Sequence, residues 1–307
     1  MSGDSSACKI TIAEIREISD GEGRNMGALA VVGGDLRQRF LCAELKRRGY
    51  TVRTFGLGED SFTLSDTVRA ADTAVILPVP VTRDGKNVQT PLSSNYECSL
   101  SDLLAVLPEG VCLLGGMIPE AWKKAFCAHG IRVTDYFQDE VFQLKNALPT
   151  AEGAIRLAME ALPVTLFGTR VAVVGYGRIG ALLTKKLVSL GAKVTALARS
   201  AIACANGELQ GADGALIENG KILFPTDCRA VFNTVPCRVI GAEDLRALSS
   251  NCVLIELASA PSGFDAKEAT DAGLRVISAP GLPGRFYPES AGLILAETVC
   301  AILGVND

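Results

Sequence analysis

The segment over residues 170–200, RVAVVGYGRIGALLTKKLVSLGAKVTALARS, constrains the fold of this chain more than any other stretch. An apolar run leads directly into a G-x-G-x-x-G motif, formed by Gly175, Gly177 and Gly180, and an apolar-periodic helix follows. In such a strand–turn–helix unit the first glycine permits a tight turn, the second lets the backbone approach a pyrophosphate, and the third lets helix and strand pack closely. The helix N-terminus adds unpaired N–H groups and a positive dipole. The segment therefore predicts a dinucleotide-binding Rossmann domain.

The glycine loop alone does not prove that a cofactor binds, because a Rossmann-like domain that has lost its ligand can keep a glycine-rich turn. The context of strand, loop and helix favours cofactor binding over that alternative. The residues that we predict to contact the cofactor in this loop are Gly175, Tyr176, Gly177, Arg178, Ile179 and Gly180.

The second strand of this domain ends in Ala198, Arg199 and Ser200. An NAD site usually carries an acid at this place, which holds the ribose 2′-hydroxyl. A carboxylate would repel a 2′-phosphate, whereas a guanidinium holds one with paired charge-assisted bonds and a serine donates another. The three residues therefore predict NADP as the cofactor, with NAD as the alternative if Arg199 is only a solvated strand-end residue.

Three further loops follow predicted strands of the same domain, NTVP at 233–236, LASAPSGFD at 257–265 and PGLPG at 280–284. Ligands of open α/β sheets bind at the carboxyl ends of the strands, so these loops are expected beside the nicotinamide and its ribose. Each of them alone can also be an ordinary turn between a strand and a helix. The predicted contacts are Asn233, Thr234, Val235, Pro236, Leu257, Ala258, Ser259, Pro280, Gly281, Leu282 and Pro283.

The rest of the chain also alternates strands with helices, which predicts an α/β protein with two doubly wound domains. Five apolar runs between residues 28 and 136 predict a flavodoxin-like N-terminal domain. We expect a boundary at Pro149-Thr150, where a helix should begin because proline suits a first helical turn. The predicted parts are a tail over 1–26, a substrate domain over 27–149, a Rossmann domain over 150–287, and an apolar helix over 288–304 that packs back on the substrate domain.

Composition and charge exclude several classes of protein. The 307 residues carry a net charge of −4, and the ten cysteines form no CxxC pair, so we expect neither nucleic acid nor an anionic membrane as partner and no metal site. No apolar run reaches the ~18 residues that a membrane-spanning helix needs. The N-terminal segment lacks a secretory pattern, and the cysteines are expected to be reduced in a cytoplasmic protein.

The motifs together resemble a known family. GGDLRQ (33–38), NALPTAEGAI (146–155), GYGRIG, NTVP and APGLPGRFYPESAG (279–292) occur in this order, and the series from residue 28 onward is similar to the family of dipicolinate synthase A subunits. The resemblance implies a formate/glycerate-dehydrogenase-like domain paired with a Rossmann domain. It also implies oxidation of a dihydrodipicolinate, from a branch of the lysine pathway, to dipicolinate with hydride transfer to NADP. The expected setting is sporulation, in the mother-cell cytoplasm, with the flavoprotein-like B subunit of the synthase as partner.

A dicarboxylate substrate needs cations and N–H donors. Arg37 is the first candidate for a carboxylate clamp, since a guanidinium at a helix start is disfavoured by the dipole unless it has another role, and Gln38 lies beside it. Arg285 is a candidate for the second carboxylate. Thr150 is a further candidate contact, and Asp35 and Glu152 are candidates for the base.

The chain holds one histidine, His129, which precedes Gly130 at a predicted helix end. It is therefore not expected to act as the base that 2-hydroxy acid dehydrogenases place beside the nicotinamide. Two alternatives stay open: another NADP-dependent dehydrogenase, similar to shikimate or alanine dehydrogenase, or a non-catalytic NADP-binding regulatory subunit. The apolar C-terminal helix also predicts a homo-oligomer.

Overall fold

The computed structural model describes residues 26–58, 62–69, 71, 73–93, 97–218, 220–259 and 261–304. The predicted tail lies almost wholly outside these residues. The chain divides into two compact units, unit 1 over Met1–Phe142 with Pro288–Asp307 and unit 2 over Gln143–Tyr287. It passes from the first to the second within helix α6 (Glu140–Ala161) and returns at the start of helix α12 (Pro288–Ile302).

Helix α6 corrects the helix start predicted at Pro149. The helix begins nine residues earlier, at Glu140, and runs through Pro149 to Ala161. Proline cannot donate a backbone hydrogen bond, but the next side chain adds one, since Thr150 Oγ1 donates to the carbonyl oxygen of Asn146 at 2.8 Å. Buried Ala147 and Ala151 continue the apolar face on both sides of the proline. The predicted domain boundary at 149/150 consequently falls inside a helix.

Unit 1 contains one parallel sheet, whose strand order is β2-β1-β3-β4-β5. Strand β2 lies on one side of β1, and β3 to β5 lie on the other side. The strand order therefore reverses between β1 and β3, and ligands of doubly wound sheets bind at such a point. The predicted flavodoxin-like arrangement has this same order. The strands are β1 (Ala28–Val32), β2 (Thr51–Phe55), β3 (Ala74–Ile76), β4 (Cys112–Gly115) and β5 (Arg132–Asp135).

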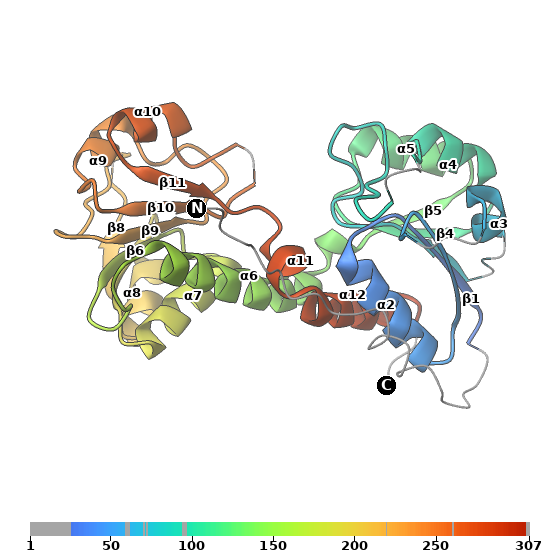
Figure 1. Cartoon of the computed structure of the whole chain (residues 1–307), viewed down its shortest axis with the longest axis horizontal. Helices are drawn as coiled ribbons and strands as arrows, with labels where there is room; N and C mark the ends of the chain where they lie inside the picture. The colour runs from blue at the N-terminus through green and yellow to red at the C-terminus, as the bar shows by residue number, and fades with distance from the viewer. Residues whose placement is uncertain are drawn as a thin grey trace, which may run out of the picture. The chain divides into compact units, whose positions relative to one another are not determined.

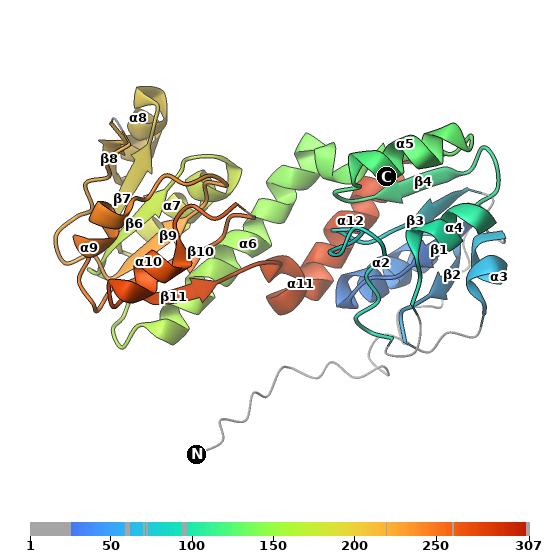
Figure 2. The same ribbon diagram turned by 90° about the horizontal axis from the view of Figure 1, so that it is seen from above.

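Helices cover both faces of this sheet (Figures 1 and 2). Helices α2 (Leu36–Arg47) and α12 pack on one face, while α3 (Leu64–Arg69), α4 (Leu100–Val106) and α5 (Glu120–Ala128) pack on the other. A short 3₁₀ helix, η1 (Tyr136–Gln138), follows β5. Gly292 lets α12 approach α2 closely, because a Cβ atom there would lie 2.6 Å from the carbonyl oxygen of Arg37.

Unit 2 contains a six-stranded parallel sheet in the order β11-β10-β9-β6-β7-β8, the arrangement expected of a Rossmann domain. Its strands are β6 (Arg170–Val174), β7 (Lys193–Ala198), β8 (Asp213–Leu216), β9 (Ala230–Asn233), β10 (Val253–Glu256) and β11 (Arg275–Ser278). The sequence did not predict β8. Its residues are only half-buried or exposed, so this edge strand has no apolar run that could mark it.

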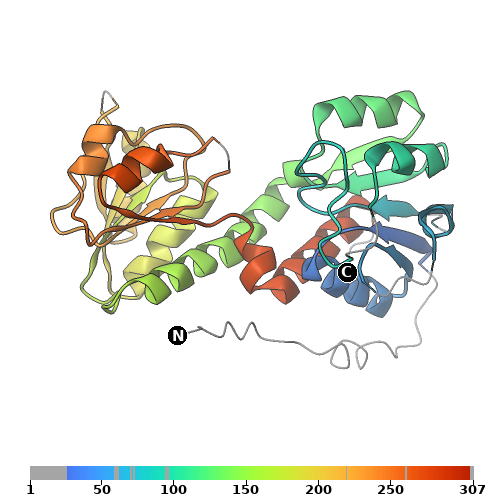
Figure 3. The ribbon, with the colours of Figure 1, turned by 45° about the horizontal axis from the view of Figure 1, so that its top comes forward.

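The two faces of the second sheet are covered by different helices. Helices α6, α7 (Arg178–Ser189) and α8 (Ala201–Leu209) lie on one face, and α9 (Ala242–Arg246) and α10 (Ala266–Asp271) lie on the other, as Figure 3 shows. A short helix, α11 (Leu282–Phe286), packs against α6. Among the described residues, no helix has the length and apolar character to cross a bilayer.

Helix α2 carries a charged cluster that makes the stability of unit 1 depend on pH. Arg47 and Arg48 both donate to the Glu44 carboxylate, at 2.7 and 2.8 Å, and the hydrogen bond from Arg47 is the main reason that the pKa of Glu44 falls from 4.5 to about 2. A lowered pKa stabilises the fold above the unfolded value and loses this effect as the pH falls toward the folded value. We expect the urea midpoint of equilibrium unfolding to fall between about pH 5 and about pH 2, and to fall more for the wild type than for Glu44→Gln. This pH window is roughly the interval between the unfolded and the folded pKa of Glu44. Equal pH dependence of the two proteins would contradict this role of Glu44.

Candidate functional site

The glycine loop of unit 2 has the geometry of a nucleotide cradle. Gly175 adopts φ +95°, and a Cβ atom there would lie 2.5 Å from Thr234 Oγ1. A Cβ atom on Gly180 would collide with the carbonyl oxygen of Gly175, so this glycine is required for the helix to pack on the loop. A Cβ atom on Gly177 would meet no atom within 4 Å. The loop therefore leaves open space at its second glycine, where a pyrophosphate would approach.

The N-terminus of α7 faces this open space. Gly177 is its N-cap residue and makes no side-chain capping hydrogen bond to the first turn, and the N–H groups at a helix start suit an anion. Arg178 is exposed and Ile179 is half-buried at the start of the helix. The residues present fit a bound dinucleotide phosphate.

Tyr176 lies differently from the other predicted contacts of this loop. Its ring packs toward α8, where a Cβ atom on Gly207 would lie 3.4 Å from the ring carbon Cε2. The hydroxyl is buried without a hydrogen-bond partner in the described part of the chain, and burial raises the pKa of Tyr176. The side chain thus helps to fix α8 against the glycine loop.

The end of β7 presents a cation and a hydroxyl to solvent. Ala198 is buried as the last residue of the strand, whereas Arg199 and Ser200 are exposed. Ser200 is the N-cap residue of α8, and its side chain makes no capping hydrogen bond. Arg199, Ser200 and the first N–H groups of α8 therefore form a small cationic surface suited to a phosphate.

The NTVP loop is tied to the glycine loop by backbone and side chain. Thr234 donates to the carbonyl oxygen of Val174 from both its N–H group and Oγ1, each at 2.9 Å. Asn233 is completely buried, and its side-chain amide donates to the carbonyl oxygen of Val235 at 3.0 Å and accepts from the N–H group of that residue. Pro236 lies at the exposed end of the loop. The structure thus brings these residues to the point between β9 and β6 where the strand order reverses.

A buried acid that the sequence analysis missed connects this loop to the next one. Glu256 is the last residue of β10 and only 8 % exposed. One of its oxygens accepts from Asn233 Nδ2 and from the N–H group of Ala258, and the other accepts from Ser262 Oγ and from the N–H group of Gly263. The signal in the sequence was a single glutamate inside the apolar run CVLIELA. Acidic side chains are almost never fully buried unless they are paired, so a glutamate at this place indicates that it has partners.

The predicted cofactor contacts in the loops after β10 and β11 differ in how exposed they are. Leu257 is buried and donates its N–H group to the carbonyl oxygen of Asn233 at 2.9 Å, while Ala258 and Ser259 lie nearer to solvent. After β11, Pro280 and Gly281 are exposed. The other two predicted contacts in this loop, Leu282 and Pro283, have buried side chains, and Leu282 lies against Gly153 of α6. Their side chains thus support the loop from the core side.

In unit 1, Arg37 is held at the point where the strand order reverses. Its guanidinium donates to both oxygens of Asp35 and, through Nη2, to the carbonyl oxygen of Val79 at 2.7 Å, and the side chain is 12 % exposed. Arg37 therefore bridges the residues after β1 and β3. Nη1 has no partner in the described part of the chain, so one amino group of the predicted clamp is left for a ligand.

Asp35 and Gln38 are also helix-capping residues. Asp35 is the N-cap residue of α2, and the Gln38 side chain accepts from its N–H group in a capping box. Gln38 is completely buried, and its Nε2 has no hydrogen-bond partner in the described part of the chain. Its amide thus lies beneath the turn that contains Gly34, whose added Cβ atom would collide with it.

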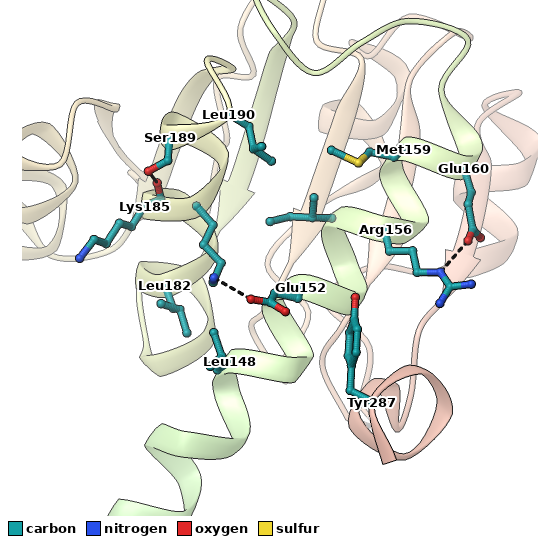
Figure 4. Close-up of a pocket in the computed structure, with 12 residues that line it drawn as sticks. Leu148, Glu152, Arg156, Met159, Glu160, Leu182, Lys185, Ser189, Leu190 and Tyr287 are labelled. Carbon is teal, nitrogen blue, oxygen red and sulfur yellow. Dashed lines mark hydrogen bonds and ion pairs between the residues drawn. The ribbon is translucent and has the colours of Figure 1, made fainter. Parts of the chain in front are cut away.

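The polar groups of the two candidates on α6 bind other residues of unit 2. Thr150 uses its hydroxyl within its own helix. Glu152 points toward α7, where its carboxylate accepts from Lys186 Nζ at 2.8 Å (Figure 4). Both side chains of this pair line a cavity of about 820 Å³ between α6, α7 and Tyr287. Lys186 is in the last turn of α7, at the opposite end of that helix from the glycine loop. The structure therefore does not bring Glu152 to the nucleotide cradle.

Two other side chains with reactive or charged groups are exposed. His129 is the C-cap residue of α5, with its Nδ1 2.9 Å from the carbonyl oxygen of Ala125. Arg285 is exposed on α11, and its guanidinium lies over the Phe286 ring. The described residues contain no group of three or more His, Cys, Asp or Glu side chains arranged to hold a metal ion.

The chain is similar in sequence to known proteins. Residues 28–137 match the family model for the N-terminal domain of the dipicolinate synthase A subunit. The chain is 28 % identical over 292 residues to the A subunit of dipicolinate synthase from Bacillus subtilis (strain 168), a match that covers 90 % of this chain and 95 % of that protein.

Solved structures show the same relationship at the level of the fold. The crystal structure of the dipicolinate synthase A subunit from Bacillus halodurans superposes with a TM-score of 0.81 and 26 % identity, covering 92 % of this chain and 99 % of that one. D-lactate dehydrogenase from Escherichia coli shares only the fold, with a TM-score of 0.60 and 12 % identity over 91 % of this chain and 98 % of that one. The resemblance to the family of dipicolinate synthase A subunits, predicted from the motifs, is thus confirmed by sequence and by fold.

Proposed function

We propose that this chain is an NADP-dependent dehydrogenase that oxidises dihydrodipicolinate to dipicolinate, as the A subunit of a dipicolinate synthase. The observation that carries the proposal is the nucleotide cradle of unit 2, in which open space at Gly177 faces the uncapped N-terminus of α7. Its similarity to dipicolinate synthase chains from two Bacillus species supports the substrate. The dehydrogenase fold supports hydride transfer as the reaction.

NADP rather than NAD is supported by the end of β7. Arg199 and Ser200 are exposed there, beside the N-terminus of α8, and the strand ends without a carboxylate. A 2′-phosphate forms a charge-assisted hydrogen bond with the guanidinium in which both groups are ionised, whereas the 2′-hydroxyl of NAD offers the guanidinium only a neutral acceptor. NADP, when bound, supplies the hydride acceptor.

The substrate carboxylates are proposed to meet Arg37. Asp35 fixes the guanidinium and partly neutralises its charge, and the carbonyl oxygen of Val79 holds Nη2, so Nη1 is the remaining donor. A pre-oriented guanidinium binds a planar carboxylate with little loss of side-chain entropy. Arg37 therefore orients the substrate, and Asp35 positions Arg37.

No histidine is needed for the proton in this proposal. Oxidation of the dihydropyridine ring removes one hydride and one proton, and the ring becomes aromatic, which makes the step strongly favourable. The carboxylates of Asp35 and Glu152 each accept from a cation, so neither is the free base that a proton acceptor should be. We propose that the ring proton passes to water.

The cellular setting follows from the same assignment. We propose that the chain forms a homo-oligomer in the mother-cell cytoplasm of a spore-forming bacterium and works there with a flavoprotein-like partner, the B subunit of the synthase. A second candidate is a regulatory subunit that binds NADP but needs its partner for turnover. It is favoured by the ion pairs of Asp35 and Glu152, which leave neither of the two candidate bases free to accept a proton.

The reaction is tested by following absorbance in the NADPH and dipicolinate bands. Purified chain, NADP and enzymatically generated precursor are mixed with and without the candidate flavoprotein-like partner. NADPH and dipicolinate rising together without that partner establish a self-sufficient enzyme, and a rise only after mixing establishes the dependent subunit. Tight NADP binding with no product in either mixture would overturn the assignment to dipicolinate synthesis.

A further inference from the structure

We propose that Glu256 is a positioning residue that shapes the nicotinamide half of the cofactor site. The proposal rests on the proposed function of unit 2 as an NADP-binding domain. Glu256 itself need not touch the ligand. It acts through the residues that it binds in the loops after β9 and β10, which are Asn233, Ala258, Ser262 and Gly263.

The surroundings of Glu256 fit an ionised carboxylate. Three of its hydrogen-bond partners are N–H donors that cannot accept, namely Asn233 Nδ2 at 2.7 Å and the backbone N–H groups of Ala258 and Gly263 at 3.0 Å. The fourth is Ser262 Oγ at 2.6 Å. A carboxylate satisfies all of them, because each oxygen accepts two hydrogen bonds. Hydrogen bonds to a charged group are stronger than those between neutral groups.

The loop after β10 depends on this carboxylate for its shape. Ala258, Ser262 and Gly263 all donate to it, so one side chain binds described residues at both ends of this loop. Gly263 also lies so close to Asn233 that an added Cβ atom would collide with the amide. The two loops are therefore packed as one unit around the 233–256 hydrogen bond.

The glycine loop is anchored separately. Thr234 donates to the carbonyl oxygen of Val174 from its own N–H and hydroxyl groups, and neither bond involves Glu256. Arg199 follows β7, on the other side of β6 from these loops. A change at Glu256 should therefore weaken the nicotinamide half of the site and leave the phosphate half in place.

The test replaces Glu256 by glutamine. Its amide keeps one acceptor oxygen but places an NH₂ group against at least one N–H donor in either orientation. We expect the Kd for NADP, measured by calorimetry, to rise by about tenfold, which is the lower end of the effect that loss of an outer hydrogen-bond partner has at metal sites. The Kd for adenosine 2′,5′-bisphosphate, which lacks the nicotinamide half, should change by less than about twofold since its site is unaltered.

Two further measurements separate positioning from folding. Hydrogen exchange without cofactor should show faster exchange of the Ala258 and Gly263 amides in Glu256→Gln, at unchanged protection of β6. The milder variant Ser262→Ala removes one donor and keeps the carboxylate, so we expect it to fold even if Glu256→Gln does not. It should also raise the Kd for NADP. Glu243→Gln, at an exposed residue of α9, is the matched control.

The outcomes distinguish this inference from the proposed function. If the wild type binds NADP and both site variants bind it equally well, the positioning role is wrong and the cofactor site stands. If NADP and adenosine 2′,5′-bisphosphate weaken equally, Glu256 supports the whole domain and the selective role is also wrong. A wild type that binds neither compound overturns the proposed function and this inference together.

Discussion

Arg199→Glu is expected to raise the Kd for NADP by about a hundredfold, since a hydrogen bond to a charged group contributes about 1.5–3 kcal/mol and about 1.4 kcal/mol corresponds to a factor of ten. The variant removes the guanidinium at the end of β7 and adds a carboxylate that repels the 2′-phosphate. The Kd for NAD should stay the same or fall, because a carboxylate accepts a hydrogen bond from the ribose 2′-hydroxyl. Titration of both cofactors by protein fluorescence or calorimetry measures the two constants.

Lys193→Glu supplies the matched control for this charge reversal. Lys193 is the exposed first residue of β7. The variant therefore makes the same change in net charge at the opposite end of the same strand. Its effect on NADP should be small, because exposed charges separated by more than about 10 Å are largely screened at 0.1 M salt. An Arg199→Glu variant that binds NADP as the control does would show that the 2′-phosphate is read elsewhere.

The strands and their order were largely predictable because buried parallel strands are short apolar runs between turns. The exception is β8, whose Asp213–Leu216 stretch lies at a sheet edge and has no such run. The other exception is Pro149, where local propensity favours a helix start. There the packing of Ala147 and Ala151 and the Thr150 hydroxyl bond outweigh the missing N–H group.

The hydrogen-bond and ion-pair partners of individual side chains were less predictable than the backbone fold. The glycine loop and Arg199 are readable because each is a local feature next to a strand. In contrast, Arg37 is held by Val79, 42 residues away, and Glu152 pairs with Lys186, 34 residues away. Such partners depend on the tertiary fold. The sequence could therefore indicate which residues were chemically suited to a role, but not whether other residues of the chain already bind their charged groups.

The three glycines of the cradle should separate folding from binding when each is replaced by alanine. Gly177 has φ −82° and ψ −164°, an extended conformation open to any residue, and its added Cβ atom would have no neighbour within 4 Å. Gly177→Ala should therefore leave the thermal unfolding midpoint unchanged. Its methyl group would occupy the space where the pyrophosphate approaches, so we expect NADP to weaken by at least about tenfold, or about 1.4 kcal/mol.

Gly180→Ala should fail differently, because its Cβ atom would collide with the backbone of Gly175. Either the loop or the start of α7 has to move, so both the unfolding midpoint and NADP binding should fall. Thermal unfolding with and without NADP resolves the two cases, since at a fixed NADP concentration the midpoint rises more the lower the Kd of the folded state for the ligand. The wild type should gain the most, Gly177→Ala should start from the wild-type midpoint but gain less, and Gly180→Ala should start lower. A Gly177→Ala protein stabilised by NADP as much as the wild type would mean that the phosphates do not lie against this loop, and the cradle would then be only a turn between β6 and α7.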